Sequence, residues 1–561
     1  MLLVDEVDNK KQFVFLLYDV DGNPVIFFDE KGNGIFSGTI RGAKIESDTD
    51  INVNKDASVG QYLRVGYISS YVNDEGKVVV NLQRTEGMQS LNIWNYTSGP
   101  NYAFAEMVFD ALYVSDHGGN CKPCICTGYD LSEDGKEVTL HIAEGVKFFD
   151  GSDCDADDVY TQMKYIAEHK DEMALFATNW KYLESAEKVG QHTVKLYLSE
   201  PFFSLEISLA YTYIAKAEEI EQYGANLFSS VPSLNGTGRW KLEEWVDGQY
   251  LKYVRNYDYW QGGDFTNVDI LYVWFITDPT AQNAAFINGE IDFIDNVNVD
   301  LRSMLDVVAD QCTMKEQIKE TMYYLQFKMD GKAPTSDQNL RFAIMHAVDR
   351  DAFCTLMGGG TVMNDFFTTH AEGHQPDKPA IGYDPELAKE YLAKSNYNGE
   401  TLVLLSRSDI EYADSIMTAM ADYLNQIGIK TQVDMVDTAT MNSRRADGTY
   451  DIFMVNLATW DGNALTQNLV PRVVQDMHHN GYVNEELNAL IMKAFGDMNA
   501  ETRVKTLEQV GDILYDLQGP LVPIVQIVGT PCVRNGLTGL IENPLGGYIF
   551  TEIAVEESYL K

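Results

Sequence analysis

Short apolar strands alternate with amphipathic helices from Lys77 to the end of the chain, and this alternation restricts the fold more than any other feature. The run KVVVNL at 77–82 has the composition of a buried strand, and NYAFAEMVFDALY at 101–113 carries apolar residues at helical spacing. The same alternation continues through 386–457. Strands joined by crossover helices are typical of α/β sheets, so we predict an α/β fold.

Two helix ends are marked by their own residues. Asp155 precedes a helical pattern with acidic residues in its first turn and basic residues in its last, so we expect it to cap the helix N-terminus. Gly428 follows the helical pattern at 413–427 and precedes a strand, which is the usual place of a C-terminal glycine.

Residues 1–75 have a different character, with short β-strands separated by Asp-Gly and Gly-Asn-Gly turns. The stretch DVDGN at 19–23 looks like the start of a calcium loop, but Pro24 stands where that loop needs its glycine, so a hairpin is favoured. GNGIFSGTIRGAKI at 32–45 and VNKDASVG at 53–60 show a weak resemblance to β-rich segments of phage tail proteins.

Acidic residues outnumber basic ones two to one, with 84 Asp plus Glu against 42 Lys plus Arg and a formal net charge of −42. Such a charge repels phosphate backbones, so we expect no nucleic-acid partner. No apolar run approaches the roughly 18 residues that span a bilayer. The start, MLLVDEVDNKKQF, lacks the pattern of a secretory signal, which leaves a cytoplasmic chain, a processed form or a fragment open.

The cysteines and histidines offer weak signals for a metal. Cys121, Cys124 and Cys126 lie close together, but no second Cys pair or Cys-His pair supplies a fourth donor, so packed thiols are favoured over a disulfide or a metal site. His478 and His479 are adjacent, and neighbouring side chains on an extended segment point in opposite directions, so surface positions are favoured. We expect no metal and no cofactor.

Several motifs occur in a fixed order over most of the chain. The stretch from Asn235 to Asp292 holds a Gly-Thr-Gly turn at 236–238, Arg-Asn-Tyr-Asp-Tyr-Trp at 255–260, Asp-Pro-Thr-Ala at 278–281 and Gly-Glu-Ile-Asp at 289–292. LSEDGKEV, NLRFAIMHAVDR, YDPELAK and GPLVPIV stand before and after it. This order resembles the family 5 extracellular solute-binding proteins of peptide and nickel ABC importers, from about Lys77 to the C-terminus.

The resemblance implies a two-lobed, periplasmic-binding-protein-like fold of type II, cluster C, with an extra inserted domain, preceded by the β-rich segment. The Gly-Thr-Gly turn would bring the chain from the inserted domain back into the first lobe, where glycine supplies backbone freedom. The expected divisions are a first lobe at 76–115, 230–300 and 516–561, an inserted domain at 116–229 and a second lobe at 301–515, after an N-terminal extension at 1–75.

The resemblance also implies a function. Two hinged lobes would close on a peptide, or another small polar solute, and present it to an ABC permease outside the cytoplasm, and we expect a monomer. Asp461 matches the family's anchor for the ligand ammonium, although Trp460 lies directly before it, and a turn-capping role stays open. Trp460 is a candidate for stacking on the ligand. Further candidates, for which core packing is the alternative, are Trp94, Tyr96, Thr97 and Ser98.

Two other classes of protein remain as alternatives. The N-terminal segment suggests a phage-tail-like or surface structural protein, and a cleft between lobes would also suit a hydrolase. The sequence has no Gly-x-Ser-x-Gly elbow, no His-Glu-x-x-His and no P-loop, so we assign no catalytic residue and expect a protein without enzymatic activity.

Overall fold

The computed structural model separates the chain into two compact units, Met1–Ile68 and Ser69–Lys561. In these units the structure describes residues 6–7, 10–11, 13–18, 24–29, 34–36, 71–73, 75–85, 87–88, 90–94, 99–201, 203–228, 234–379, 381–459, 463–544 and 548–560. In this part of the chain no helix is both long and apolar enough to cross a membrane.

The N-terminal unit contains short antiparallel strands. β1 (Glu6–Val7) pairs with β2 (Lys10–Lys11), and β3 (Phe13–Tyr18), β4 (Pro24–Asp29) and β5 (Gly34–Phe36) form a three-stranded sheet. Tyr18 pairs with Pro24, so strands β3 and β4 form a hairpin around DVDGN, as predicted, although 19–23 itself lies outside the described residues.

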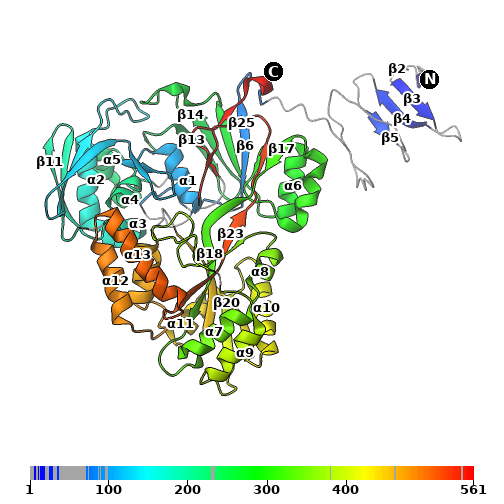
Figure 1. The fold of residues 1–561 in the computed structure, drawn as a ribbon. Coiled ribbons are helices and arrows are strands. Elements are labelled where there is room, and N and C mark those ends of the chain that lie inside the picture. Colours follow the sequence, from blue (N-terminus) through cyan, green and yellow to red (C-terminus); the bar gives the residue numbers. More distant parts are fainter. Residues whose placement is uncertain are drawn as a thin grey trace. The chain divides into compact units, whose positions relative to one another are not determined.

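The first lobe is built on a mixed seven-stranded sheet (Figure 1). Its central strand β6 (Val79–Arg84) is parallel to both neighbours, β15 and β16. Val80 and Leu82 of β6 are fully buried, which matches the apolar run in the sequence. In sheet order the other strands are β13 (Trp240–Val246), β14 (Tyr250–Arg255), β15 (Ile270–Phe275), then β16 (Phe293–Ile294), β24 (Cys532–Arg534) and β17 (Cys312–Met314). The helices of this lobe are α1 (Gly99–Val108) and α6 (Pro279–Asn288).

The inserted domain leaves the first lobe after the hairpin of β7 (Tyr113–Ser115) and β8 (Cys121–Pro123). Its antiparallel sheet has the order β11 (Leu183–Gly190), β12 (Thr193–Leu198), β10 (Glu137–Ile142), β9 (Cys126–Leu131). Its helices are α2 (Ala156–His169), α3 (Ala174–Asn179), α4 (Leu205–Ala210) and α5 (Ala217–Tyr223). Its apolar residues share one core with the first lobe.

The second lobe is built on a six-stranded sheet with helices on both faces (Figure 1). Residues of β18 alternate between two cores, with Met322 and Tyr324 in one and Tyr323 and Leu325 in the other. The sheet order is β19 (Thr361–Val362), β23 (Leu521–Gly529), β18 (Gln317–Phe327), β22 (Ile452–Ala458), β20 (Thr401–Arg407), β21 (Lys430–Val436).

The helices of the second lobe divide between these two cores. α7 (Gln338–Ala347), α8 (Arg350–Leu356), α9 (Pro385–Lys394) and α10 (Ala413–Gln426) contribute to the core that contains Tyr323. α11 (Thr438–Ala446), the π-helix η8 (Leu465–Val474), α12 (Glu485–Gly496) and α13 (Ala500–Tyr515) contribute to the core that contains Tyr324.

Two neighbouring strands connect the lobes. β18 and β23 pair antiparallel in the second lobe, and each continues into a strand of the first-lobe sheet, β17 and β24 (Figure 1). The sequence placed 516–561 in the first lobe and 301–515 in the second. The strand pairing instead puts β23 in the second-lobe sheet and β17 in the first-lobe sheet, because the chain crosses at 315–316 and 530–531.

Both predicted helix ends are confirmed. Asp155 caps α2 and forms a capping box, in which its side chain accepts a hydrogen bond from the backbone of the first turn and the Asp158 side chain accepts one from the Asp155 N–H. Gly428 follows α10 with a φ of 96°, a left-handed conformation that glycine adopts at little cost.

The Gly-Thr-Gly turn lies where expected, directly before β13, but for a different physical reason. Neither Gly236 nor Gly238 has a positive φ. A Cβ on Gly236 would lie 2.0 Å from the carbonyl oxygen of Val108, and one on Gly238 would lie 2.6 Å from the Val108 carbonyl carbon. The glycines therefore allow close backbone contact with the end of α1, and the Gly238 N–H donates to Val108 O at 3.0 Å.

We expect Gly238→Ala to destabilise the protein by about 1–3 kcal/mol, because the new methyl group would overlap backbone atoms that cannot move aside. Gly128→Ala is the matched control, since a Cβ there meets nothing within 4 Å. Urea unfolding of both variants tests this. Equal stability of the two would contradict the close-contact explanation.

Candidate functional site

A cavity of about 450 Å³ lies between the inserted domain and the second lobe. On one side it is lined by the tip of the β7–β8 hairpin at 118–121, which precedes the inserted domain, and by Tyr129 and the start of α4, including Glu206, from the inserted domain. From the second lobe it is lined by His370, Glu372, Asn463, Met498 and Arg503. The cavity therefore has walls from both sides of the connecting strands β18 and β23.

An aromatic contact joins the two sides of this cavity. Phe495 of α12 packs edge-on against Phe203 of the inserted domain, with ring centroids 5.9 Å apart, and lies 6.4 Å from Tyr182. The Arg503 guanidinium lies 4.9 Å from the centroid of the Phe203 ring. Phe203 is part of the inserted domain, yet its side chain packs against the core of the second lobe.

Arg503 is held by a bidentate ion pair. Its Nε and Nη2 atoms donate to the two carboxylate oxygens of Glu372, each at 2.6 Å, and its Nη1 donates to the carbonyl of Asp497. Planar pairs of this kind fix both side chains and balance their charges. Arg503 therefore lines the cavity as a neutralised cation.

Glu320 forms a buried polar centre where the connecting strands meet. The side chain is fully buried on β18, at an irregularity in the β18–β23 pairing. Its Oε1 accepts hydrogen bonds from the backbone N–H of His370 at 3.2 Å and from Gln526 Nε2 of β23 at 3.3 Å. His370 Nδ1 lies 2.8 Å from the same oxygen. One carboxylate thus ties both connecting strands to the loop that carries His370.

The position of His370 follows from this contact. Its Nδ1 faces the buried carboxylate, and the two ring nitrogens of an imidazole point in nearly opposite directions, so Nε2 faces away from Glu320. The His370 side chain is 47% exposed and lines the cavity.

The loop that carries His370 has a second carboxylate–histidine pair. Buried Asp365 accepts from the backbone N–H groups of Phe367 and Gln375, and His374 Nδ1 lies 3.2 Å from its Oδ2. The hydrogen bond to Asp365 raises the pKa of His374. These contacts hold the loop in place on both sides of His370.

A second cavity, of about 310 Å³, lies in the first lobe beside the strands of the β7–β8 hairpin. Buried Asp110 borders it and accepts hydrogen bonds from Trp260 Nε1 at 2.7 Å and from the Tyr259 hydroxyl at 3.2 Å. Burial raises the pKa of Asp110 to about 6, although these donors oppose the shift. The last two residues of the Arg-Asn-Tyr-Asp-Tyr-Trp motif therefore hold a buried carboxyl.

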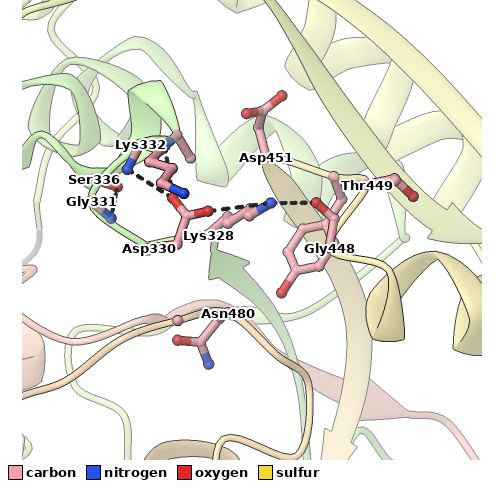
Figure 2. Close-up of polar contacts among 12 residues, drawn as sticks. Lys328, Asp330, Gly331, Lys332, Ser336, Gly448, Thr449, Asp451 and Asn480 are labelled. Atoms are coloured by element: carbon pink, nitrogen blue, oxygen red, sulfur yellow. Dashed lines mark hydrogen bonds and ion pairs between the residues drawn. The ribbon is translucent and has the colours of Figure 1, made fainter.

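A third, more open depression of about 530 Å³ lies at the far end of the second-lobe sheet, where Phe327 pairs with Ile452. Figure 2 shows Lys328 between Asp330 and the Gly448 carbonyl. Asp330 also accepts from the backbone N–H groups of Lys332 and Ala333. Because these groups bind each other, we interpret this cluster as one that stabilises the end of β18 and not as a ligand site.

The sequence-predicted ligand residues fall mainly outside the described part of the chain. Trp94 is described and is 1% exposed, packed edge-on against Phe228 and near Tyr165, which is the core position that we had kept as the alternative. The residues that lie outside it are Tyr96, Thr97, Ser98, Trp460 and Asp461. Asn463, two residues after Asp461, lines the cavity.

The surface interpretation of His478 is wrong. Its ring is buried, with Nδ1 2.7 Å from Gln326 Oε1 and Nε2 3.0 Å from Arg445 Nη1. Burial lowers its pKa to about 3, so the ring is neutral at physiological pH. The adjacent His479 is exposed.

The three clustered cysteines lie on the β7–β8 hairpin and at the start of β9. Cys124 and Cys126 are buried free thiols, and burial raises the pKa of both. Cys121 is partly exposed and borders the cavity between the lobes.

Glu320, His370 and Arg503 were missed by the sequence analysis. Each lies far along the chain from its partner, and no motif marks any of them.

Comparison with known proteins agrees with this architecture. The model of the bacterial extracellular solute-binding proteins, family 5, matches residues 120–469. The chain belongs to this family. It is 25% identical over 495 residues to heme-binding protein A of Haemophilus influenzae, covering 82% of this chain and 89% of the relative. It is 23% identical over 480 residues to the glutathione-binding protein GsiB of Salmonella paratyphi A, covering 80% and 89%.

A solved structure confirms the fold class of this family 5 protein. The oligopeptide-binding protein AppA of Bacillus subtilis, in complex with a nonapeptide, superimposes with a TM-score of 0.67 at 19% identity, covering 85% of this chain and 99% of AppA. The predicted two-lobed binding-protein fold of type II is therefore confirmed, and the chain is a solute-binding component of an ABC importer.

We expect Glu320→Ala to cost at least about 2 kcal/mol of unfolding free energy, because it leaves the buried Gln526 amide and the backbone N–H of His370 without this acceptor. Glu390→Ala, at an exposed position on α9, is the control. Chemical denaturation measures both, and a Glu320 variant as stable as the control would contradict the role of this carboxylate.

Asp110 predicts a pH dependence of stability. Its folded-state pKa of about 6 lies above the ordinary 3.8, so its stabilising contribution is complete below 3.8 and is lost as the pH rises through about 6. For a shift of about 2 units the loss approaches 3 kcal/mol. Asp110→Asn removes this loss, so its stability relative to the wild type should improve between pH 4 and pH 7.5. A constant difference in urea titrations at both pH values would contradict the raised pKa.

Proposed function

We propose that this solute-binding protein captures peptides, or a related small polar solute, in the cavity between its lobes and delivers them to an ABC permease. The observation that carries the proposal is the cavity itself, whose walls come from lobes connected through β18 and β23. A ligand that touches both walls favours the closed form, because its contacts are complete only there.

The choice of a peptide rests on three features. AppA, which shares the fold, was solved with a nonapeptide, and a relative is named for glutathione. The cavity offers carboxylate, imidazole and amide groups beside aromatic side chains, a combination that suits a backbone with many polar groups. Another relative is named for heme, so the binding experiment below also includes this larger ligand.

The residues that we propose for ligand contact follow from the family pattern. Asp461 would hold a ligand ammonium by a charge-assisted hydrogen bond, and Trp460 would stack on the ligand. Asn463 supports this placement, because it lies two residues after Asp461 and lines the cavity. Tyr96, Thr97 and Ser98 would contact the ligand from the first lobe, before α1, while the buried Trp94 would support them from the core.

The wider setting is also part of the proposal. Members of this family are extracellular solute-binding proteins, which supports a periplasmic or cell-surface location for this chain. It would act as a monomer, bind without chemical change of the ligand, and dock on a membrane permease when closed. For residues 1–75 we propose no function beyond the weak resemblance to phage tail proteins.

The experiment is a calorimetric titration with trialanine, glutathione and heme, combined with small-angle X-ray scattering. We expect one ligand to bind in the micromolar range or tighter, to reduce the radius of gyration and to be recovered intact. Asp461→Asn should weaken trialanine binding by about tenfold or more, since a hydrogen bond to a charged group contributes about 1.5–3 kcal/mol. Asp447→Asn, on an exposed position after α11, is the control. Release of a cleaved product, or a radius unchanged by every ligand, would contradict the proposal.

A further inference from the structure

We propose that the cavity between the lobes selects ligands with a cationic group in addition to any peptide N-terminus, and that Glu206 is the residue that binds this group. This inference rests on the proposed function, because it names the class of ligand that the same cavity accepts. It follows from the balance of charges on the cavity wall.

The charged groups of the cavity leave Glu206 unbalanced. Arg503 is neutralised by its bidentate contact with Glu372. His370 already faces the carboxylate of the buried Glu320 through its Nδ1 atom, at 2.8 Å. Glu206 has no cationic partner among the described residues. The cations that line the cavity thus have carboxylate partners of their own, and Glu206 is a carboxylate of the wall without such a pair in the described part of the chain.

The geometry of Glu206 suits a ligand contact. It lies in the first turn of α4, after Ser204, and its side chain borders the cavity. The Tyr129 hydroxyl donates to its Oε1 at 3.0 Å, which holds the carboxylate in place while leaving most of its acceptor sites open. No described residue donates to the second oxygen, which can accept from a ligand ammonium.

The surroundings strengthen this interaction. Tyr129, Phe203 and Met498 form apolar parts of the wall, and an ion pair beside such surfaces is stronger than one in open water. The formal net charge of −42 adds a long-range attraction for cations and repels anionic solutes.

An organic ammonium fits better than a bare metal ion. Among the described residues, no three His, Cys, Asp or Glu side chains gather closely enough to hold a metal. A single carboxylate with a neighbouring phenol and aromatic surface is instead a common environment for an alkylammonium group.

The test compares trilysine, trialanine and triglutamate, with spermidine and nickel chloride as further probes, by calorimetry at 0.15 M salt, which screens long-range attraction. We expect the wild type to bind trilysine at least about tenfold more tightly than trialanine, since tenfold corresponds to one charge-assisted contact. Triglutamate should bind most weakly.

Glu206→Gln should remove the preference for trilysine and change trialanine binding by less than about twofold. Glu221→Gln, at an exposed position of α5, is the matched control because it changes the net charge equally. Glu206→Lys extends the series, and the melting temperature of each variant confirms folding. Tight binding of spermidine that is lost in Glu206→Gln also supports the inference, for a ligand that is not a peptide.

Several results would overturn the inference. Trialanine or triglutamate binding as tightly as trilysine would do so while leaving the proposed function intact. Equal effects of the Glu206 and Glu221 variants would show that only total charge matters. Binding of nickel without binding of any organic cation would also reject it. If none of the probes bound and the ligands of the functional test failed as well, the proposed function would fall first.

Discussion

The buried carboxylate of Glu320 fixes the second-lobe side of the cavity at the base of the two connecting strands. It lies where the chain passes between the lobes, and it joins β18, β23 and the loop that carries His370. A buried carboxyl group without hydrogen-bond partners would be costly, so these contacts keep the strands and the loop in one arrangement. This contact therefore determines where His370, and with it the second-lobe wall of the cavity, lies.

The sequence predicted the fold well because the signals for it are local. An apolar run such as 77–82 specifies a buried strand, Asp155 specifies a helix start, and Gly428 a helix end, each through chemistry within a few residues. The ordered motifs then placed the chain in its family. The Gly-Thr-Gly turn shows a limit even here, since its position was predicted but its cause, contact with Val108, involves a helix more than a hundred residues earlier.

The cavity could not be predicted in the same way, because its residues meet only through tertiary structure. Glu320 and His370, or Glu372 and Arg503, have no spacing that relates them. The burial of His478 depends on Gln326, which lies on the distant strand β18. The crossing at 530–531 could not be predicted either, because the membership of β23 and β24 in different sheets depends on strands that are distant in the sequence.

The contact of Phe495 with Phe203 has a consequence for how the protein responds to a solute. It joins the inserted domain to the second lobe through side chains alone. A contact of this kind adds favourable free energy to an arrangement that brings the two sides together, and no ligand atom supplies that energy. The equilibrium between open and closed molecules without ligand, and with it the apparent affinity, then depends in part on residues that contact each other and not the ligand. Substitutions on this aromatic contact would let affinity change over evolution while the recognition chemistry stayed the same.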